Sequence, residues 1–226
     1  MKLIENIEIK NSSKKIDFFD SLKFMEKRVS EINDQNKPEL IWFLNHNHIY
    51  TMGTSGNKKE IINKINIPLI KTNRGGKSTY HGPGQRIVYF LIDLKKRKKD
   101  IRKFVNTIEK STILVLKEFN IKAETFQDRI GIWVTKNNNT TLLQEQKIGA
   151  IGLRIKQWTT YHGLSFNINP NLSYYKNHTS KQHLSDDLQP YIGGTKNSKG
   201  LSKKVLNMKL IKESQSHSKN NHYCEM

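Results

Sequence analysis

The stretch Arg74-Gly-Gly-Lys-Ser-Thr-Tyr-His-Gly-Pro-Gly-Gln85 is the most unusual part of this 226-residue sequence. It contains four glycines and one proline within twelve residues, together with the hydroxyls of Thr79 and Tyr80 and the imidazole of His81. Glycines let the backbone approach a ligand closely, and these polar side chains can hold it by hydrogen bonds. The stretch matches neither of the glycine-rich nucleotide patterns, G-x-G-x-x-G and G-x-x-x-x-G-K-[ST]. It therefore predicts a ligand-binding loop over residues 72–85 that is not a nucleotide cradle.

Short apolar runs on either side of this loop predict strands. Residues 40–44 form a compact apolar run, and residues 67–70 and 87–92 bracket the loop. Runs of this length are too short for helices and are typical of buried strands. Three more strands are expected further along, separated by polar turns at 136–140 and 156–158, and they cover residues 131–134, 148–155 and 160–168.

Two segments have helical periodicity. Apolar residues recur every three or four positions from Phe18 to Ile32, which predicts an amphipathic helix over residues 17–33 whose apolar stripe packs on a sheet. Asp100 is a suitable N-cap for a second helix, which Asn120 can end. Few helices and many strands, without regular alternation, predict an α+β domain in which a mixed sheet packs against helices.

Composition limits the class of protein. No run approaches the roughly 18 apolar residues of a membrane span, and the first fifteen residues show no signal-peptide pattern. The single cysteine, Cys224, excludes an internal disulfide and suits a reducing compartment, so a cytoplasmic location is expected. The net charge of +19 has three interpretations: nucleic-acid binding, a general compositional bias of the coding sequence, or attraction of acidic protein partners. Because the basic residues are spread along the whole chain, nucleic-acid binding is the weakest of the three.

Two further patterns admit both a functional and a structural interpretation. His46 and His48 would share one face of a strand, but no third ligand lies near them in the sequence, so hydrogen bonding at a strand end is preferred over metal binding. The run Lys95-Lys-Arg-Lys-Lys99 resembles a nuclear or nucleic-acid signal. It lies between a strand and a helix, where a solvated connection is the simpler interpretation.

The string RGGKSTYHGPGQ at residues 74–85 resembles the octanoyl-acyl-carrier-protein:protein octanoyltransferases, also called lipoate-protein ligase B. The resemblance continues in LNHNHIYTMG (44–53), RIGIWV (129–134), KIGAIGLR (147–154) and WTTYHGLSFNIN (158–169). It reaches to about Tyr175, so residues 1–175 are expected to form one octanoyltransferase domain. The resemblance implies a single-domain α+β fold like that of the biotin and lipoate protein ligases.

The resemblance also implies a two-step acyl transfer. A cysteine thiolate takes the octanoyl group from its thioester, then passes it to a lysine amine, with a lysine ammonium beside the thiol to favour the thiolate. Lys147 matches that lysine. The family's acyl-binding residues map here to Arg74, Gly75, Gly76, Lys77, Ser78, Thr79, Tyr80, His81, Ala150, Ile151, Gly152, Gly163, Leu164 and Ser165.

The implied partners are octanoyl-acyl carrier protein and the lipoyl domains of 2-oxoacid dehydrogenase and glycine cleavage proteins. Both kinds of partner tend to be acidic in such families, which fits the positive charge of this chain. No metal, other cofactor, nucleic acid or membrane is implied, and a monomer is expected.

The sequence departs from the family after the strand at residues 160–168. The family has a short Pro-Cys-Gly segment there, whereas this chain has Ser180 and Lys181 at about the positions of the proline and cysteine. Cys224 has no evident basic neighbour to activate it, and Ser180 has no paired histidine base to make it a substitute nucleophile. Residues 176–226 are polar and are expected to form a divergent, poorly ordered tail. A shifted reading frame is our hypothesis for its origin.

Three functions remain open from the sequence. The first is octanoyl transfer, which the missing cysteine places in doubt. The second is non-catalytic binding of acyl carrier protein or a lipoyl domain. The third is lipoate ligation with ATP, against which the continuation His-Gly-Pro-Gly-Gln (81–85) argues, because it lacks the basic, triple-glycine pattern associated with adenylating relatives.

Overall fold

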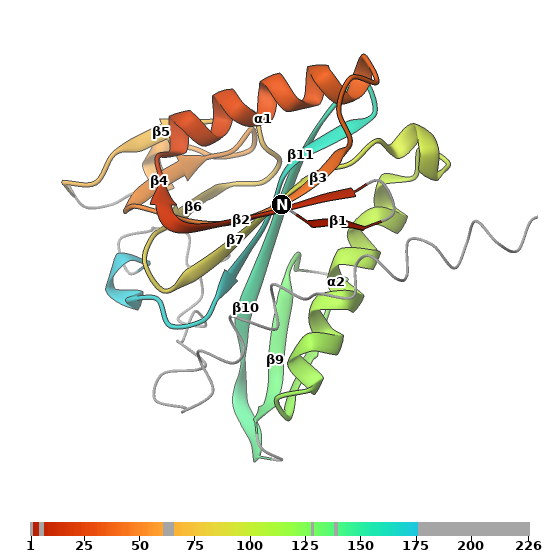
Figure 1. Ribbon diagram of the computed structural model, residues 1–226. Coiled ribbons are helices and arrows are strands. Elements are labelled where there is room, and N and C mark those ends of the chain that lie inside the picture. The colour runs from red at the N-terminus through yellow and green to blue at the C-terminus, as the bar shows by residue number, and fades with distance from the viewer. Residues whose placement is uncertain (1, 5–6, 61–65, 128, 138–139, 176–226) are drawn as a thin grey trace, which may run out of the picture.

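The structure is a computed structural model, and it describes residues 2–4, 7–60, 66–127, 129–137 and 140–175. These residues form two sheets and two α-helices (Figure 1). The large sheet has the strand order β1-β2-β3-β7-β11-β10-β9-β8. Its strands are β1 (Lys2–Ile4), β2 (Ile7–Ile16), β3 (Glu39–His46), β7 (Gln85–Leu91), β8 (Ile121–Glu124), β9 (Ile132–Asn137), β10 (Thr140–Lys156) and β11 (Thr159–Asn167).

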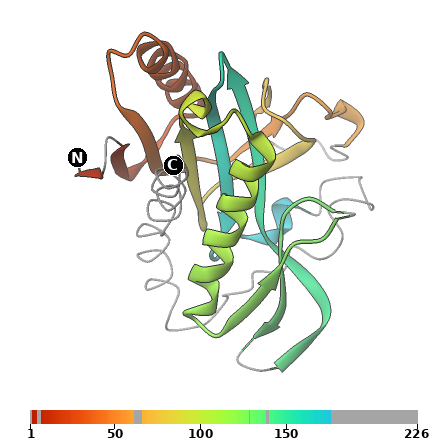
Figure 2. The same ribbon diagram turned by 90° about the vertical axis from the view of Figure 1, so that its right-hand side faces the viewer.

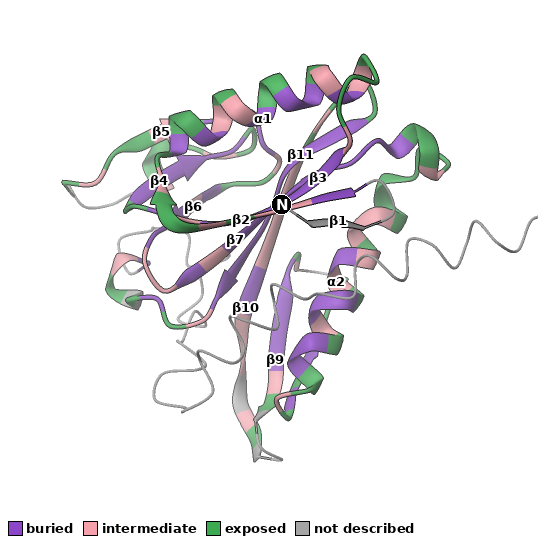
Figure 3. Ribbon diagram, viewed as in Figure 1, coloured by how far each residue is buried: buried purple, intermediate pink, exposed green. Residues whose placement is uncertain are grey.

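The two helices cover opposite faces of the large sheet. Helix α1 (Phe18–Asn33) begins at its N-cap Asp17, and α2 (Ile101–Lys117) begins at its N-cap Asp100. Met25 and Val29 of α1 pack on Trp42, whereas Ile108 of α2 packs in a separate core with Phe43. Side chains of a strand alternate between its faces, so β3 is apolar at every position from Leu40 to Leu44 because both of its faces are covered there. Figure 2 shows α2 lying along the sheet, and Figure 3 shows the buried inner side of α1.

The α+β fold and both helices agree with the sequence prediction, and the differences lie in the strands. Strands β1, β2 and β8 were not predicted, and neither was the strand at Ile49–Met52. The second helix ends at Lys117, before Phe119, and Asn120 has a left-handed φ of 58°. Only β2 and β3 pair in parallel within the large sheet.

The expected loop at residues 72–85 contains a strand, so that prediction was incomplete. Strand β6 (Ser78–His81) pairs with β4 (Ile49–Met52), which also pairs with β5 (Leu69–Lys71). These three strands form the small sheet. The hydroxyl-rich Ser78–His81 segment is therefore held by backbone hydrogen bonds, and residues 72–77 and 82–84 make the turns on either side of it. Three short 3₁₀ helices complete the described fold: η1 (Lys58–Glu60), η2 (Leu94–Arg97) and η3 (Leu172–Tyr174).

Candidate functional site

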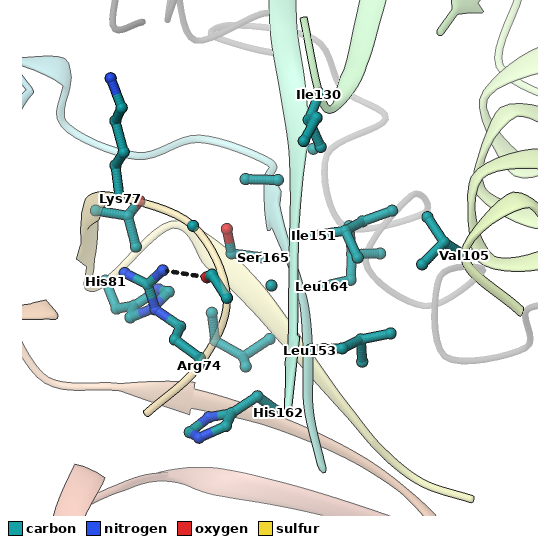
Figure 4. A pocket seen from close by; sticks show the side chains of 18 of the residues that line it. Arg74, Lys77, His81, Val105, Ile130, Ile151, Leu153, His162, Leu164 and Ser165 are labelled. Carbon is teal, nitrogen blue, oxygen red and sulfur yellow. Dashed lines mark hydrogen bonds between the residues drawn. The ribbon is translucent and has the colours of Figure 1, made fainter. Parts of the chain in front are cut away.

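A cavity of about 640 Å³ lies where the turn before β6 approaches the middle of β10 and β11. In Figure 4, Arg74, His81, His162 and Ser165 lie on one side of the strands, while Ile151, Leu153, Leu164 and Val105 lie on the other. The cavity is therefore polar on the side of the small sheet and apolar on the side of α2. Among the residues that line it are Arg74, His81, Lys147, Ile151, Gly152 and His162.

The cavity opens at an edge of β10. β9 pairs with β10 only as far as Gly149, and beyond it residues 150–156 pair with β11 alone. The Gly75 N–H donates to the Leu153 carbonyl on this edge, at 3.0 Å, and so fixes the turn against β10. A Cβ at Gly152 would lie 3.1 Å from the Gly75 carbonyl oxygen. Glycine at this position lets the two backbones approach closely.

Side-chain hydrogen bonds of Arg74 fix the conformation of the turn before β6. Its Nη2 donates to the Thr51 carbonyl at 2.7 Å and to the Thr51 hydroxyl at 2.9 Å, and its Nη1 donates to the Gly75 carbonyl at 3.0 Å. The side chain is buried, and burial lowers the pKa of Arg74 to about 10, so it remains charged at neutral pH. Because its guanidinium donates to the neutral oxygens of Thr51 and Gly75, the main role of Arg74 is to stabilise this turn.

Three buried imidazoles lie around Arg74, and each is neutral at pH 7. Burial lowers the pKa of His46 to about 4 and that of His162 to about 3, and it holds the pKa of His81 well below 6.5. His46 donates through Nδ1 to the Ile16 carbonyl, so its Nε2 accepts from the Tyr89 hydroxyl at 2.7 Å. Nδ1 of His81 has no hydrogen-bond partner among the described residues. The polar side of the cavity thus combines neutral imidazoles with the buried Arg74 cation.

Lys147 lies at the other end of the site, on β10. Its Nζ lies 5.3 Å from the centroid of the Trp133 ring and makes no ion pair with any described residue. Burial lowers its pKa from 10.5 to about 8. About a tenth of this amine is therefore neutral at pH 7 and about half at pH 8, which suits proton transfer or nucleophilic chemistry.

The Lys147 amine occupies space that a glycine leaves open. Gly131 has a φ of 132°, and a Cβ on it would lie 2.4 Å from Cε and 3.1 Å from Nζ of Lys147. The pairing of β9 with β10 also shifts register between Lys147 and Gly149. Such bulges commonly redirect a side chain beside a functional site.

The structure brings most of the sequence-predicted site residues together. Lys147 lines the same cavity as the predicted acyl-binding residues of the turn and of β10 and β11, with one exception. Tyr80 does not line it: its ring stacks on Tyr174 at 4.9 Å, and its hydroxyl bonds to His48. Lys77 lies at the rim, exposed and pointing away from the other labelled residues (Figure 4).

Other residues of the site carried no sequence signal of their own. Phe18, Tyr89, Asn167 and Tyr175 line the cavity from elements far apart in the sequence. His162, within the recognised segment 158–169, has a left-handed φ of 59°, which is uncommon for a residue with a side chain. Only the packing of β7 and β11 beside the turn shows that these residues belong to the site.

His46 and His48 do not share a strand face, contrary to expectation. β3 ends at His46, which is buried against Ile16 and Tyr89, whereas His48 is exposed and its Nδ1 bonds to the Tyr80 hydroxyl. Across the described ranges, no cluster of three or more potential metal ligands is found. Ser180, Lys181 and Cys224 lie outside the described residues.

Among the described residues, no helix is both long and apolar enough to cross a membrane.

Comparison with known proteins identifies the family. Residues 17–216 match the model of the lipoyl protein ligase A/B catalytic domain. The octanoyltransferase of Wolbachia pipientis wMel is 46% identical over 166 residues, covering 73% of this chain and 78% of the relative. The octanoyltransferase of Bartonella quintana is 43% identical over 173 residues, covering 75% of this chain and 71% of the relative.

Among solved structures, Plasmodium falciparum LipL1, crystallised in complex with lipoate, superposes with a TM-score of 0.63 at 16% identity. The match covers 97% of this chain and 63% of the other. At this identity the likeness concerns the fold, which is that of the lipoate protein ligases. The chain therefore belongs to the lipoyl protein ligase A/B catalytic domain family, and within it to the octanoyltransferases.

Proposed function

We propose that this chain transfers an octanoyl group from octanoyl-acyl carrier protein to a lysine of lipoyl domains. The observation that carries the proposal is the unpaired Lys147 amine, which faces the same cavity as the Arg74 turn and the β10–β11 glycines. The apolar side of that cavity, with Ile151 and Leu153, suits an alkyl chain. The polar side presents hydrogen-bond donors to a thioester carbonyl.

In the family's chemistry, a thiolate attacks the thioester carbon, a new C–S bond forms, and the carrier thiol leaves. The target lysine amine then attacks the acyl-enzyme, a C–N bond forms, and the enzyme thiol is released. Lys147 would hold or deliver the proton at each exchange, because a pKa of about 8 lets it act in both directions near neutral pH. The sequence contains one thiol, that of Cys224, which has no evident basic neighbour in the sequence and lies outside the described residues.

The partners follow from this proposal. The acyl donor is octanoyl-acyl carrier protein, and the acceptors are lipoyl domains of 2-oxoacid dehydrogenase and glycine cleavage proteins. The chain is proposed to act in the cytoplasm, as a monomer and without a bound cofactor.

A second candidate function is binding without transfer. It is favoured by the segment around Ser180 and Lys181, which lacks the cysteine that the family resemblance leads one to expect. In that case the chain would hold the octanoyl carrier protein or a lipoyl domain in the same cavity.

One assay separates the two candidates. The purified chain is incubated with octanoyl-acyl carrier protein and an apo lipoyl domain, and octanoylated lysine is quantified by mass spectrometry. Product above a control without the chain supports transfer. Binding of octanoyl-acyl carrier protein without product would overturn the transfer proposal in favour of the binder.

Two further reactions test whether transfer depends on the cysteine and whether the chain uses ATP. The variant Cys224→Ser removes the one thiol, so a transfer that depends on a cysteine stops in this variant. Replacing the octanoyl carrier protein by lipoate and ATP tests ligation. Product in that arm alone would assign the chain to the ATP-dependent activity instead.

A further inference from the structure

The pairing of β9 with β10 decides which face of the sheet carries Lys147. Ile132 and Val134 of β9 belong to the core that contains Ile108 of α2, so Trp133 between them lies on the opposite face. Lys147 pairs with Trp133 across the two strands, and its Nζ lies 5.3 Å from the centroid of that ring. The Lys147 amine is therefore on the face of the sheet that is turned away from α2.

That face is the polar side of the cavity. Ser165 lies there with Arg74 (Figure 4), and Ala150 of β10 pairs directly with Ser165 of β11. The N–H groups of Gly76 and Lys77, in the turn before β6, donate to no described residue, and both residues line the cavity. The cavity therefore combines a primary amine with amide donors that can bind the oxygen of an acyl carbonyl.

No carboxylate in the described part of the chain pairs with this amine. Glu145, two residues before Lys147 on β10, pairs instead with Arg129 at 3.2 Å. The Arg129 guanidinium carbon lies 4.4 Å from the centroid of the Trp133 ring, so that ring has a second cation beside it. Burial lowers the pKa of Lys147 to about 8, and a neutral amine with a free lone pair is therefore present near neutral pH.

The amine is also the strongest nucleophile among the described groups that line the cavity. None of the described residues is a cysteine. The hydroxyls of Ser78, Thr79 and Ser165 need a paired base to attack an acyl group, and in the described structure no histidine bonds to any of them. The imidazoles of His81 and His162 would form acyl derivatives that water hydrolyses, whereas an amine forms a stable amide.

We propose that Lys147 is itself an acylation site, at which the chain takes the acyl group of a medium-chain acyl thioester as a stable amide. The Nζ lone pair attacks the thioester carbonyl carbon, a C–N bond forms and the C–S bond breaks. The thiol leaves with the proton that the nitrogen releases, so no further reactant is needed. This inference rests on the proposed function for the octanoyl thioester as the acyl source.

Acylation of Lys147 has a direct consequence for transfer. An amide does not ionise and does not pass its acyl group to another amine. The modified chain keeps one acyl group and lacks the amine that holds the proton in the proposed transfer. Self-acylation and transfer are therefore competing fates of the same bound thioester.

The test supplies the thioester without an acceptor domain. The purified chain is incubated with S-octanoyl-N-acetylcysteamine, treated with neutral hydroxylamine, which cleaves thioesters but not amides, and examined by intact mass and peptide mapping. We expect one resistant octanoyl group on Lys147, formed at least about tenfold faster than on the exposed Lys136 of β9. The rate on Lys147 should rise with pH and level off above about 8. The S-acetyl thioester, whose chain is too short to fill the cavity, should show much less preference for Lys147.

Two variants assign the adduct. Lys147→Met should lose the resistant octanoyl group, with urea unfolding as the check that this variant is folded, and Cys224→Ser should retain it at the same rate. The proposal is overturned if the adduct persists in Lys147→Met, if Lys147 reacts no faster than Lys136, or if Lys147 is modified by octanoate with ATP but not by the thioester.

The outcome is separate from that of the transfer assay, because no lipoyl domain is present. A chain that acylates Lys147 but makes no octanoylated lipoyl domain would refute transfer and support self-acylation. A chain that makes octanoylated lipoyl domain and shows no adduct on Lys147 would do the reverse.

Discussion

Two cations of the cavity, the buried Arg74 and the half-buried Lys147, make opposite kinds of contact. Arg74 donates to Thr51 and Gly75 and holds the turn before β6 against the small sheet. Lys147 lies over the space at Gly131, with no ion pair to any described residue. A cation whose donors are all occupied stabilises the fold, whereas a half-buried cation without an ion-pair partner is available for chemistry.

The same contrast explains their ionisation. Burial lowers the pKa of both groups, but Arg74 starts from 12.5 and stays charged at about 10, while Lys147 falls from 10.5 to about 8. Only Lys147 changes its charge near neutral pH. We therefore expect substitution of Lys147 to lower the rate of transfer and substitution of Arg74 to lower the free energy of unfolding.

The largest effect is expected for Lys147→Met on transfer. Loss of the proton-handling amine should lower the rate at least about 100-fold, the usual scale for general acid–base groups. The free energy of unfolding at pH 7 should stay the same or rise, because the variant no longer buries an ammonium group. Product formation by mass spectrometry and urea unfolding measure the two quantities.

Lys136→Met is the control for this variant, because Lys136 is exposed on the neighbouring strand β9. Its rate should be unchanged. A Lys147→Met variant that transfers normally would remove Lys147 from the chemistry.

Arg74→Met should act on stability. Thr51 and Gly75 would lose donors to buried acceptors, and about 2–4 kcal/mol of unfolding free energy should be lost. Lys77→Met, in the same turn but exposed, should cost little. Equal stability of the two variants by urea unfolding would contradict the structural role of Arg74.

Gly131→Ala tests the space that holds the Lys147 amine. A Cβ there would displace Cε and Nζ toward solvent, so the pKa of Lys147 should rise from about 8 toward 10.5. The pH dependence of acylation of Lys147, followed by mass spectrometry, reports this pKa. In the unaltered chain, stability should rise with pH between about 8 and 10.5, since the unfolded chain then binds the proton that the folded chain has lost.

Gly84→Ala is the matched control for strain, because Gly84 also has a positive φ, of 86°, and a crowded Cβ position. It should destabilise the fold but leave the pKa of Lys147 near 8. If both variants shift that pKa alike, general loosening of the fold is responsible rather than the space at Gly131.

The smallest effect at pH 7 is expected for His162→Asn, whose consequence is measured as stability against pH. His162 has a pKa of about 3 when folded and 6.5 when unfolded, so its contribution to stability falls as pH drops from about 6.5 to 3. Asparagine tolerates the left-handed φ of 59° and does not titrate. The variant should lose stability less steeply with acid, by up to about 1 kcal/mol per pH unit in thermal or urea unfolding. An unchanged slope would mean that His162 is already protonated or exposed.

Much of the fold was predictable because local chemistry and tertiary packing agree. Asp17 and Asp100 begin the two helices as expected, and the apolar run at residues 40–44 is a strand covered on both faces. Strand β6 was missed because Ser78–His81 is polar: its strand conformation depends on pairing with β4, about thirty residues earlier in the chain. The edge strand β1 likewise depends on pairing with β2.

The sequence by itself determined the family and the residues of the turn, since the string from Arg74 to Gln85 combines glycines and polar groups in an order that few folds require. Only the tertiary structure decided that Lys147 lies beside this turn and that Gly131 leaves room for its amine. The physical reason is that burial, and with it the pKa of an amine, is set by neighbours that pairing of distant strands brings together.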